Sequence, residues 1–225
     1  MLPVDDRPVI ENERMTALAG MILLGLMMVE LVAAANLHAL LSVHVYVGVL
    51  LAGPLVVKLG STGYRFLSYY TGTSAFVHRG PPSLPLRILA PLLVAMTLLV
   101  LGSGIGLLVT GPALAGSLLP IHNISALVLL PIIVIHIVAH IRRAPRLVAN
   151  DWRKQSAEQV PGRGRRLGVN LGALMLGAIA ALLLLPAAAP WFTWVETSQA
   201  IPAPLIVGTV IAILLLFATR PLRWR

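Results

Sequence analysis

The sequence predicts an all-α integral membrane protein, folded as one domain of six transmembrane helices. The chain of 225 residues is 58% hydrophobic and only 11% charged, far outside the usual range of soluble domains. Its apolar residues gather into runs of about twenty, the length that crosses roughly 30 Å of hydrocarbon. The distribution of positive charge along the chain agrees with the same number of crossings.

Six apolar runs define the predicted helices. The first contains one charged residue, Glu30, and a turn at Asn36 leads directly into the second. Pro54, Pro91 and Pro131 lie inside the runs, which is compatible with membrane helices that pack against neighbours. The predicted helices cover residues 15–35, 38–58, 88–109, 122–141, 168–187 and 203–219. No repeat or low-complexity linker divides them, so we expect a single domain over residues 1–225.

The first run has a second interpretation, as a cleaved signal peptide. Ala33, Ala34 and Ala35 resemble a small-residue cleavage site. However, the 14 residues before the run are net acidic, and the run is longer than the apolar core of a typical signal peptide. A retained transmembrane helix is therefore the preferred interpretation.

Positive charge is confined to one side of the predicted bundle. Six crossings place the N-terminus, residues 59–87, residues 142–167 and the C-terminus on a common side. All 17 lysines and arginines lie in these segments or at the adjoining helix end, and the opposite connections contain none. The positive-inside rule makes this side cytoplasmic, so we expect a plasma (cytoplasmic) membrane protein with both termini cytoplasmic. The net charge of +9 then indicates membrane lipid, and not nucleic acid, as the partner of the basic segments.

The absence of cysteine excludes several kinds of redox site. Disulfides, cysteine-ligated iron–sulfur clusters, thiolate zinc sites and C-x-x-C-H haem attachment all require thiols. The GSGIG sequence at 102–106 is no dinucleotide-binding motif, because it lies in an apolar run without a preceding strand. Any redox cofactor must therefore be held without thiols, and chemistry on an organic substrate would belong to another polypeptide.

Five of the six histidines lie in or at the ends of the second and fourth predicted helices, which run in the same direction. If one residue of the second helix lies level with a residue of the fourth, any other pair with the same separation in sequence is therefore also level. His44 and His122 are separated by 78 residues, and so are Lys58 and His136. The separation of 14 positions from His122 to His136 corresponds to about 21 Å along a helix and nearly the same face. The pattern predicts two metal centres at different depths, one between His44 and His122 and one between Lys58 and His136.

These motifs, H44-x13-K58 and H122-x13-H136, resemble the ligand helices of the membrane cytochromes b. That group includes the cytochrome b561-like and ferric-reductase-like families and the cytochrome b subunits of periplasmic oxidoreductases. The resemblance covers roughly residues 15–141 and implies a four-helix core that holds two haem b groups. It further implies electron transfer, as a subunit of an oxidoreductase, between an extracytoplasmic redox enzyme and quinone or across the membrane.

Lys58 departs from the family pattern, which has a second histidine at this position. The inner haem would then have lysine–histidine ligation, find another ligand, or be missing. A lysine must be neutral to bind iron, which requires a lowered pKa. A lysine at the cytoplasmic end of a helix also commonly extends to the lipid headgroups.

Further residues have candidate roles around the predicted centres. Glu30 is a carboxylate inside the first helix, suited to proton handling beside a haem or quinone or to a hydrogen bond between helices. His140, one turn beyond His136, is a substitute ligand or a partner for a haem propionate. Gly48, one turn from His44, leaves room for a flat macrocycle.

Arg65 and Tyr64 lie where a cytoplasmic interfacial segment would contact propionates or a quinone headgroup. Ordinary anchoring at the membrane interface explains these two residues equally well.

Two other functional classes remain open from the sequence. In a cation or proton transporter the histidines would line a conduction path, although the predicted helices contain few further polar groups. In a cofactor-free membrane scaffold, the clustering of histidines on two helices would be a coincidence.

Overall fold

The computed structural model describes residues 5–152 and 160–197, and every regular element within them is helical. The elements are α1 (Arg7–Ala35), α2 (Leu37–Leu50), α3 (Ala52–Tyr70), α4 (Ser74–Arg79), α5 (Leu84–Thr110), α6 (Ala115–His140), α7 (Arg143–Trp152), α8 (Arg163–Leu184) and α9 (Ala189–Thr197), with 3-10 turns η1 (Gly111–Leu114) and η2 (Leu185–Ala188). The all-α prediction is confirmed for these residues. The sixth predicted helix, residues 203–219, lies outside them.

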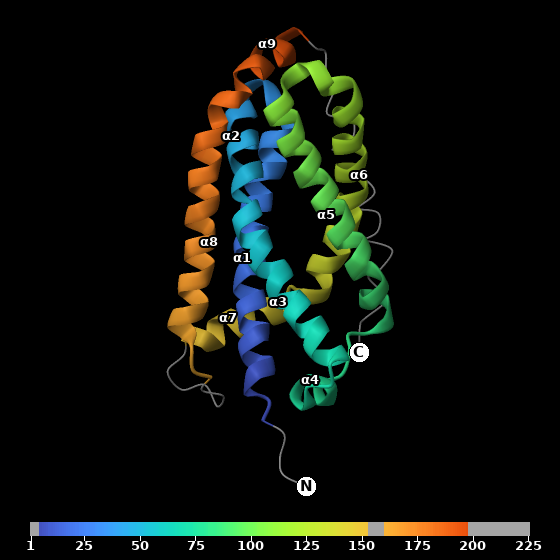
Figure 1. Cartoon of the computed structure of the whole chain (residues 1–225), viewed down its shortest axis with the longest axis vertical. Helices are drawn as coiled ribbons and strands as arrows, with labels where there is room; N and C mark the ends of the chain where they lie inside the picture. The colour runs from blue at the N-terminus through green and yellow to red at the C-terminus, as the bar shows by residue number, and fades with distance from the viewer. Residues whose placement is uncertain (1–4, 153–159, 198–225) are drawn as a thin grey trace.

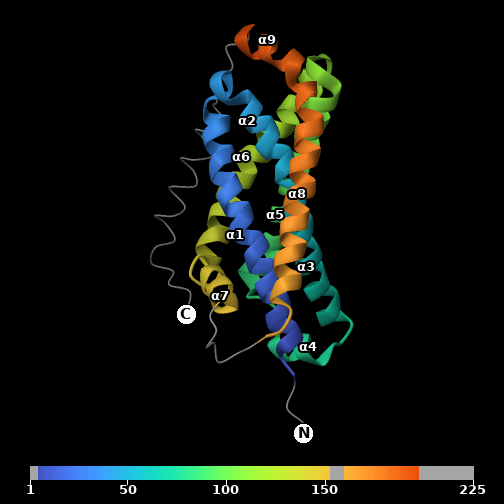
Figure 2. The ribbon, with the colours of Figure 1, turned by 90° about the vertical axis from the view of Figure 1, so that its left-hand side faces the viewer.

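The described helices form an elongated bundle (Figures 1 and 2). Four helical stretches among the described residues are long and apolar enough to cross a membrane, namely residues 7–35, 37–70, 84–140 and 163–197. The third stretch folds back at η1, so that α5 and α6 lie side by side (Figure 1). The first described residues, α4 and α7 lie at one end of the bundle, called here the N-terminal end, and α9 lies at the other, the α9 end.

Helices extend into segments that were expected to be connections. The expectation that residues 59–87 and 142–167 form loops is wrong in part, because α3 continues to Tyr70 and α4, α7 and the start of α8 are helical. Apolarity marks a membrane-crossing stretch but not the end of an amphipathic helix. On α3, the polar side chain of Ser61 pairs with the Thr16 hydroxyl of α1 at 2.8 Å. Helix α6 also begins at Ala115, so His122 lies two turns inside the helix.

The break between α2 and α3 coincides with close packing against α8. Pro54 has no N–H to donate to the carbonyl of Leu50, one helical turn earlier. That carbonyl instead faces Gly177 of α8, where an added Cβ would lie 2.7 Å from the Leu50 oxygen. A Cβ at Gly53 would overlap the carbonyl of Ala173 on α8. Glycines on both helices thus allow the two backbones to approach each other closely, as in other membrane helix pairs.

The α5–α6 hairpin is attached to the rest of the bundle at the α9 end. A buried cluster joins Leu41 of α2, Leu107 of α5 and Trp191 of α9, and the indole Nε1 of Trp191 donates a hydrogen bond to the Leu107 carbonyl at 3.2 Å. By contrast, α6 packs along α5 and its backbone makes few close approaches to α2 or α3. The face of α6 that carries the histidines therefore approaches α2 and α3 through side chains.

We expect Gly53→Ala to destabilise the protein by about 1–3 kcal/mol, because the new methyl group collides with the backbone of α8. Gly60→Ala, on the same helix, is the matched control because nothing lies within 4 Å of its added Cβ. The control should be neutral or slightly stabilising, since alanine favours helix. Thermal unfolding of the detergent-solubilised variants measures both effects. Equal melting temperatures would contradict the close contact.

Candidate functional site

His44 of α2 and His122 of α6 lie opposite each other in the half of the bundle toward the α9 end. Their ring centroids are 6.2 Å apart, and the ring planes cross at 83°. Both rings are largely but not fully buried. The equal-depth argument predicted this pairing, and the observed distance confirms that the two side chains meet.

The Nδ1 atom of each histidine already has a polar neighbour. Nδ1 of His44 lies 2.6 Å from Oε1 of Glu30 on α1, although the ring N–H and the carboxylate are not aligned as a hydrogen bond in this conformation. Nδ1 of His122 lies 3.0 Å from the carbonyl oxygen of Val100 and 3.2 Å from the hydroxyl of Ser103, both on α5. With Nδ1 engaged in this way, Nε2 is the nitrogen of each ring that remains for a ligand.

The dimensions of this pair suit two axial ligands of one metal. Metal–nitrogen bonds of about 2 Å, with each ring centre roughly 1 Å behind its nitrogen, separate two ligating imidazole centroids by about 6 Å. Among the described residues, no three His, Cys, Asp or Glu side chains converge in a group that could hold a bare ion. A metal held by these two histidines would therefore have to bring its other ligands, as the iron of haem does.

Two glycines lie near the His44–His122 pair. A Cβ at Gly104 of α5 would lie 3.1 Å from Cε1 of His122, so a larger residue there would displace the ring. Gly48, expected to leave room for a macrocycle, instead faces the Glu30 carboxylate, whose Oε1 would lie 3.7 Å from an added Cβ. Oε2 of Glu30 is buried without a hydrogen-bond partner among the described residues.

A second group of nitrogen-bearing side chains lies further toward the N-terminal end. The rings of His136 and His140 on α6 stack with centroids 4.5 Å apart, and Nδ1 of His140 donates to the carbonyl of His136 at 2.9 Å. Lys58 of α3 interacts electrostatically with His136. Its Nζ packs against Gly20 of α1, 2.9 Å from the position of an added Cβ. The structure thus brings Lys58 into the neighbourhood of the α6 histidines.

The remaining predicted site residues lie elsewhere. Arg65 donates to Oε1 of Glu13 at 3.1 Å, and Tyr64 packs edge-on against Phe76 with ring centroids 5.5 Å apart. Both belong to the N-terminal end of the bundle. Their described contacts involve neither the His44–His122 pair nor the group of Lys58, His136 and His140.

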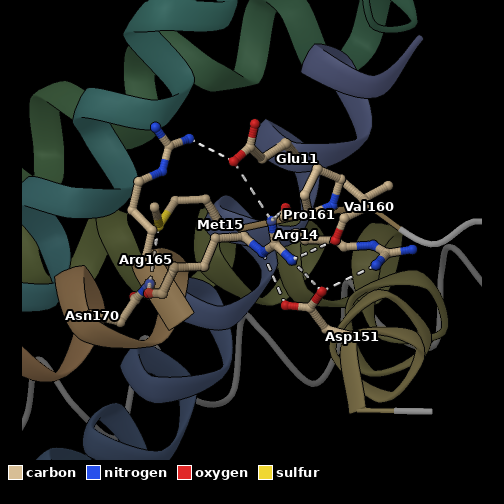
Figure 3. Close-up of polar contacts among 9 residues, drawn as sticks. Glu11, Arg14, Met15, Asp151, Val160, Pro161, Arg165 and Asn170 are labelled. Atoms are coloured by element: carbon tan, nitrogen blue, oxygen red, sulfur yellow. Dashed lines mark hydrogen bonds and ion pairs between the residues drawn. The ribbon is translucent and has the colours of Figure 1, made fainter. Parts of the chain in front are cut away.

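Two buried carboxylates organise the N-terminal end, and the sequence interpretation assigned neither a role. Glu13 of α1 contacts arginines from three other segments, with shortest N–O distances of 2.7–3.2 Å: Arg65 of α3, Arg79 of α4 and Arg143 of α7. Asp151 of α7 binds both Arg14 of α1 and Arg166 of α8 (Figure 3).

Arg166 is fully buried, and its guanidinium is held on several sides. It donates to both oxygens of Asp151 and to the carbonyl of Pro161. Its own backbone carbonyl accepts from the side chain of Asn170 at 2.9 Å. Nearby, Glu11 pairs with Arg165 at 2.6 Å (Figure 3). The only sequence signal for these contacts was the presence of acidic residues in the polar segments that also contain the arginines.

The pKa of the Asp151 carboxyl is held below its usual range. Burial by itself would raise this pKa, but hydrogen bonds from Arg166 and Arg14, together with the positive charges of both guanidinium groups, outweigh that effect. The carboxylate is therefore ionised at neutral pH and links α7 to α1 and α8.

Comparison with protein-family models, curated proteins and solved structures finds no match for this chain.

Asp151→Asn should lower the stability of the protein by about 3–5 kcal/mol, because it leaves two buried guanidinium groups without their carboxylate. Asp5→Asn is the control, since Asp5 pairs with Arg7 on the exposed surface and such pairs contribute little. Thermal unfolding in detergent measures both variants, and similar melting temperatures would contradict a structural role for Asp151.

The same group predicts a pH dependence. Because the pKa of Asp151 is lower in the folded protein, its stabilisation is fully present above the unfolded pKa of about 3.9. That stabilisation is lost as pH falls through the lower folded value. Asp151→Asn should reduce the loss of stability in this acid range, and an unchanged pH profile would contradict this assignment.

Proposed function

We propose that this chain is a membrane-embedded b-type cytochrome whose outer haem is held by His44 and His122. The observation that carries the proposal is the pairing of their rings at 6.2 Å. Nδ1 of His122 is hydrogen-bonded to the Val100 carbonyl, and Nδ1 of His44 lies 2.6 Å from Oε1 of Glu30. Metal-ligating histidines usually have such a partner on the other ring nitrogen, which selects the tautomer and orients the ring.

The chain's own residues would bind and orient the group. His44 and His122 would hold the group through Nε2. The Val100 carbonyl would orient the ring of His122, and Gly104 leaves space for that ring. When bound, haem supplies a one-electron Fe³⁺/Fe²⁺ couple, which the protein tunes through ligands, hydrogen bonds and burial.

A second, inner haem would lie between Lys58 and His136, about 21 Å further along α6 than the outer one. No carboxylate forms an ion pair with Lys58 in the part of the chain that the structure describes, so its Nζ is not committed to a salt bridge there. His140 is the alternative ligand, because its Nδ1 bonds to a backbone carbonyl and its Nε2 remains.

The proposed setting is the plasma membrane, with both termini cytoplasmic. Helices α1, α2–α3, α5, α6 and α8 would supply five crossings and residues 203–219 the sixth. The Glu13 and Asp151 clusters lie at the end rich in arginine, which the positive-inside rule makes cytoplasmic. The protein would act as the electron-transfer subunit of an oxidoreductase, between an extracytoplasmic redox enzyme and quinone or across the membrane.

The purified wild-type protein should show a Soret band and a reduced α-band typical of haem b. His44→Ala and His122→Ala should each remove the outer haem, because one axial ligand is lost. His38→Ala and His78→Ala are matched controls on exposed histidines and should keep the full haem content. A colourless wild-type protein after expression with added haem would exclude the proposal and favour a transporter or scaffold.

The number of haems per chain, measured in the wild type, Lys58→Ala and His136→Ala, tests for the inner haem. We expect two haems per wild-type chain and loss of the inner one in His136→Ala. Retention of both haems with unchanged spectra in Lys58→Ala would eliminate lysine ligation.

The proposed orientation is testable with single cysteines, because the native chain has none. Ala113→Cys, in η1, should react with a membrane-impermeant maleimide in intact spheroplasts. Ser83→Cys, between α4 and α5, should react only after the membrane is permeabilised. Both native side chains are exposed in the structure, so burial would not mask the result. The opposite labelling pattern would reverse the orientation.

A further inference from the structure

The two histidines of the outer pair have partners of different charge. His122 bonds through Nδ1 to a neutral carbonyl and a neutral hydroxyl. His44 has a carboxylate oxygen of Glu30 at 2.6 Å from its Nδ1. In the part of the chain that the structure describes, His44 is the one side chain that forms an ion pair with Glu30. No lysine or arginine there neutralises this carboxylate.

We propose that Glu30 is a positioning residue that acts through His44 to lower the reduction potential of the outer haem. The inference rests on the proposed function and assigns to Glu30 a role in setting the potential. In that role Glu30 would carry no electron and transfer no proton, and its carboxylate would remain a hydrogen-bond acceptor in both oxidation states of the group.

The direction follows from the chemistry of the ligand. With Nε2 of His44 used to hold the group, the ring proton would be on Nδ1, and this nitrogen lies 2.6 Å from Oε1 of Glu30. An anionic acceptor at this position makes the imidazole a stronger donor. A stronger donor and a nearby negative charge stabilise Fe³⁺ more than Fe²⁺, and the low dielectric of the interior strengthens the effect. The potential is therefore lowered.

Burial and close packing hold Glu30 at this distance. Its side chain is only 14% exposed, and its other oxygen, Oε2, has no hydrogen-bond partner among the described residues. Gly48 faces the carboxylate from α2, and Oε1 of Glu30 would lie at ordinary van der Waals distance, 3.7 Å, from a Cβ added there. A buried carboxylate without other partners is costly, and its polar neighbour here is the imidazole nitrogen of His44, 2.6 Å away.

Glu30→Gln tests the proposal by removing the charge while keeping a side chain of nearly the same shape. Potentiometric titration of the purified wild-type and variant proteins, followed at the α-band, measures the midpoint potential. The outer haem is identified as the component that His44→Ala removes. We expect a more positive midpoint in Glu30→Gln, together with altered g-values of the ferric low-spin signal in electron paramagnetic resonance.

Ser103→Ala is the matched control, because it removes a neutral partner from the other histidine and leaves the Val100 carbonyl in place. Its midpoint should rise by less than that of Glu30→Gln, because a neutral hydroxyl influences the ligand less than a carboxylate does. A Glu30→Gln protein that binds haem with an unchanged midpoint would overturn the proposal. An equal rise of the midpoint potential in Ser103→Ala would also overturn the proposal, because the removal of any polar group near the two histidines would then have the same effect.

Glu30→Asp keeps the test decisive if Glu30→Gln does not bind haem. The shorter carboxylate weakens the contact with Nδ1, so a smaller rise in midpoint supports the proposal and an unchanged midpoint contradicts it. Loss of haem in both variants shows a role in binding and also overturns it. A wild-type protein without haem would instead contradict the proposed function itself, so the two failures are distinguishable.

Discussion

Burial of ionisable groups in a low-dielectric interior is the constraint on which this structure depends. A charge in such a place is tolerated when it is paired or hydrogen-bonded. Glu13 and Asp151 meet this requirement by each binding arginines from two or more segments. These contacts join α1, α3, α4, α7 and α8 at one end of the bundle. Glu30 meets it in another way, with a histidine as its partner.

The same constraint acts differently at the two ends of the bundle. At the N-terminal end, arginines surround the carboxylates and cancel their charge. Toward the α9 end the described helices contain few charges, so the carboxylate of Glu30 keeps its influence on His44. The α5–α6 hairpin contributes His122 and is joined to the bundle there by the contact of Trp191 with Leu107. Helices α2 and α6 thus meet through the two imidazoles.

The pairing of His44 with His122 could be predicted because it depends only on regular geometry. Two parallel helices with the same rise per residue place equal offsets at equal depths, and the positions of the basic residues along the chain define which helices are parallel. Helix ends were predicted less well. Helix α3 continues to Tyr70 and α7 begins at Arg143 because amphipathic segments gain stability from tertiary contacts that apolarity does not reveal.

By itself, the sequence determined a helical protein with span-length apolar helices, the segregation of its positive charge and the depth of its histidines. These features depend on composition and on distance along a helix. Only the tertiary structure decided the partners: Glu30 with His44, and Asp151 with two arginines. It also showed that Gly48 faces Glu30 and that Arg65 is bound to Glu13. Such pairings depend on how each helix is rotated about its axis and on how closely glycines let the backbones approach. Both are set by packing of the whole bundle, which no single segment encodes.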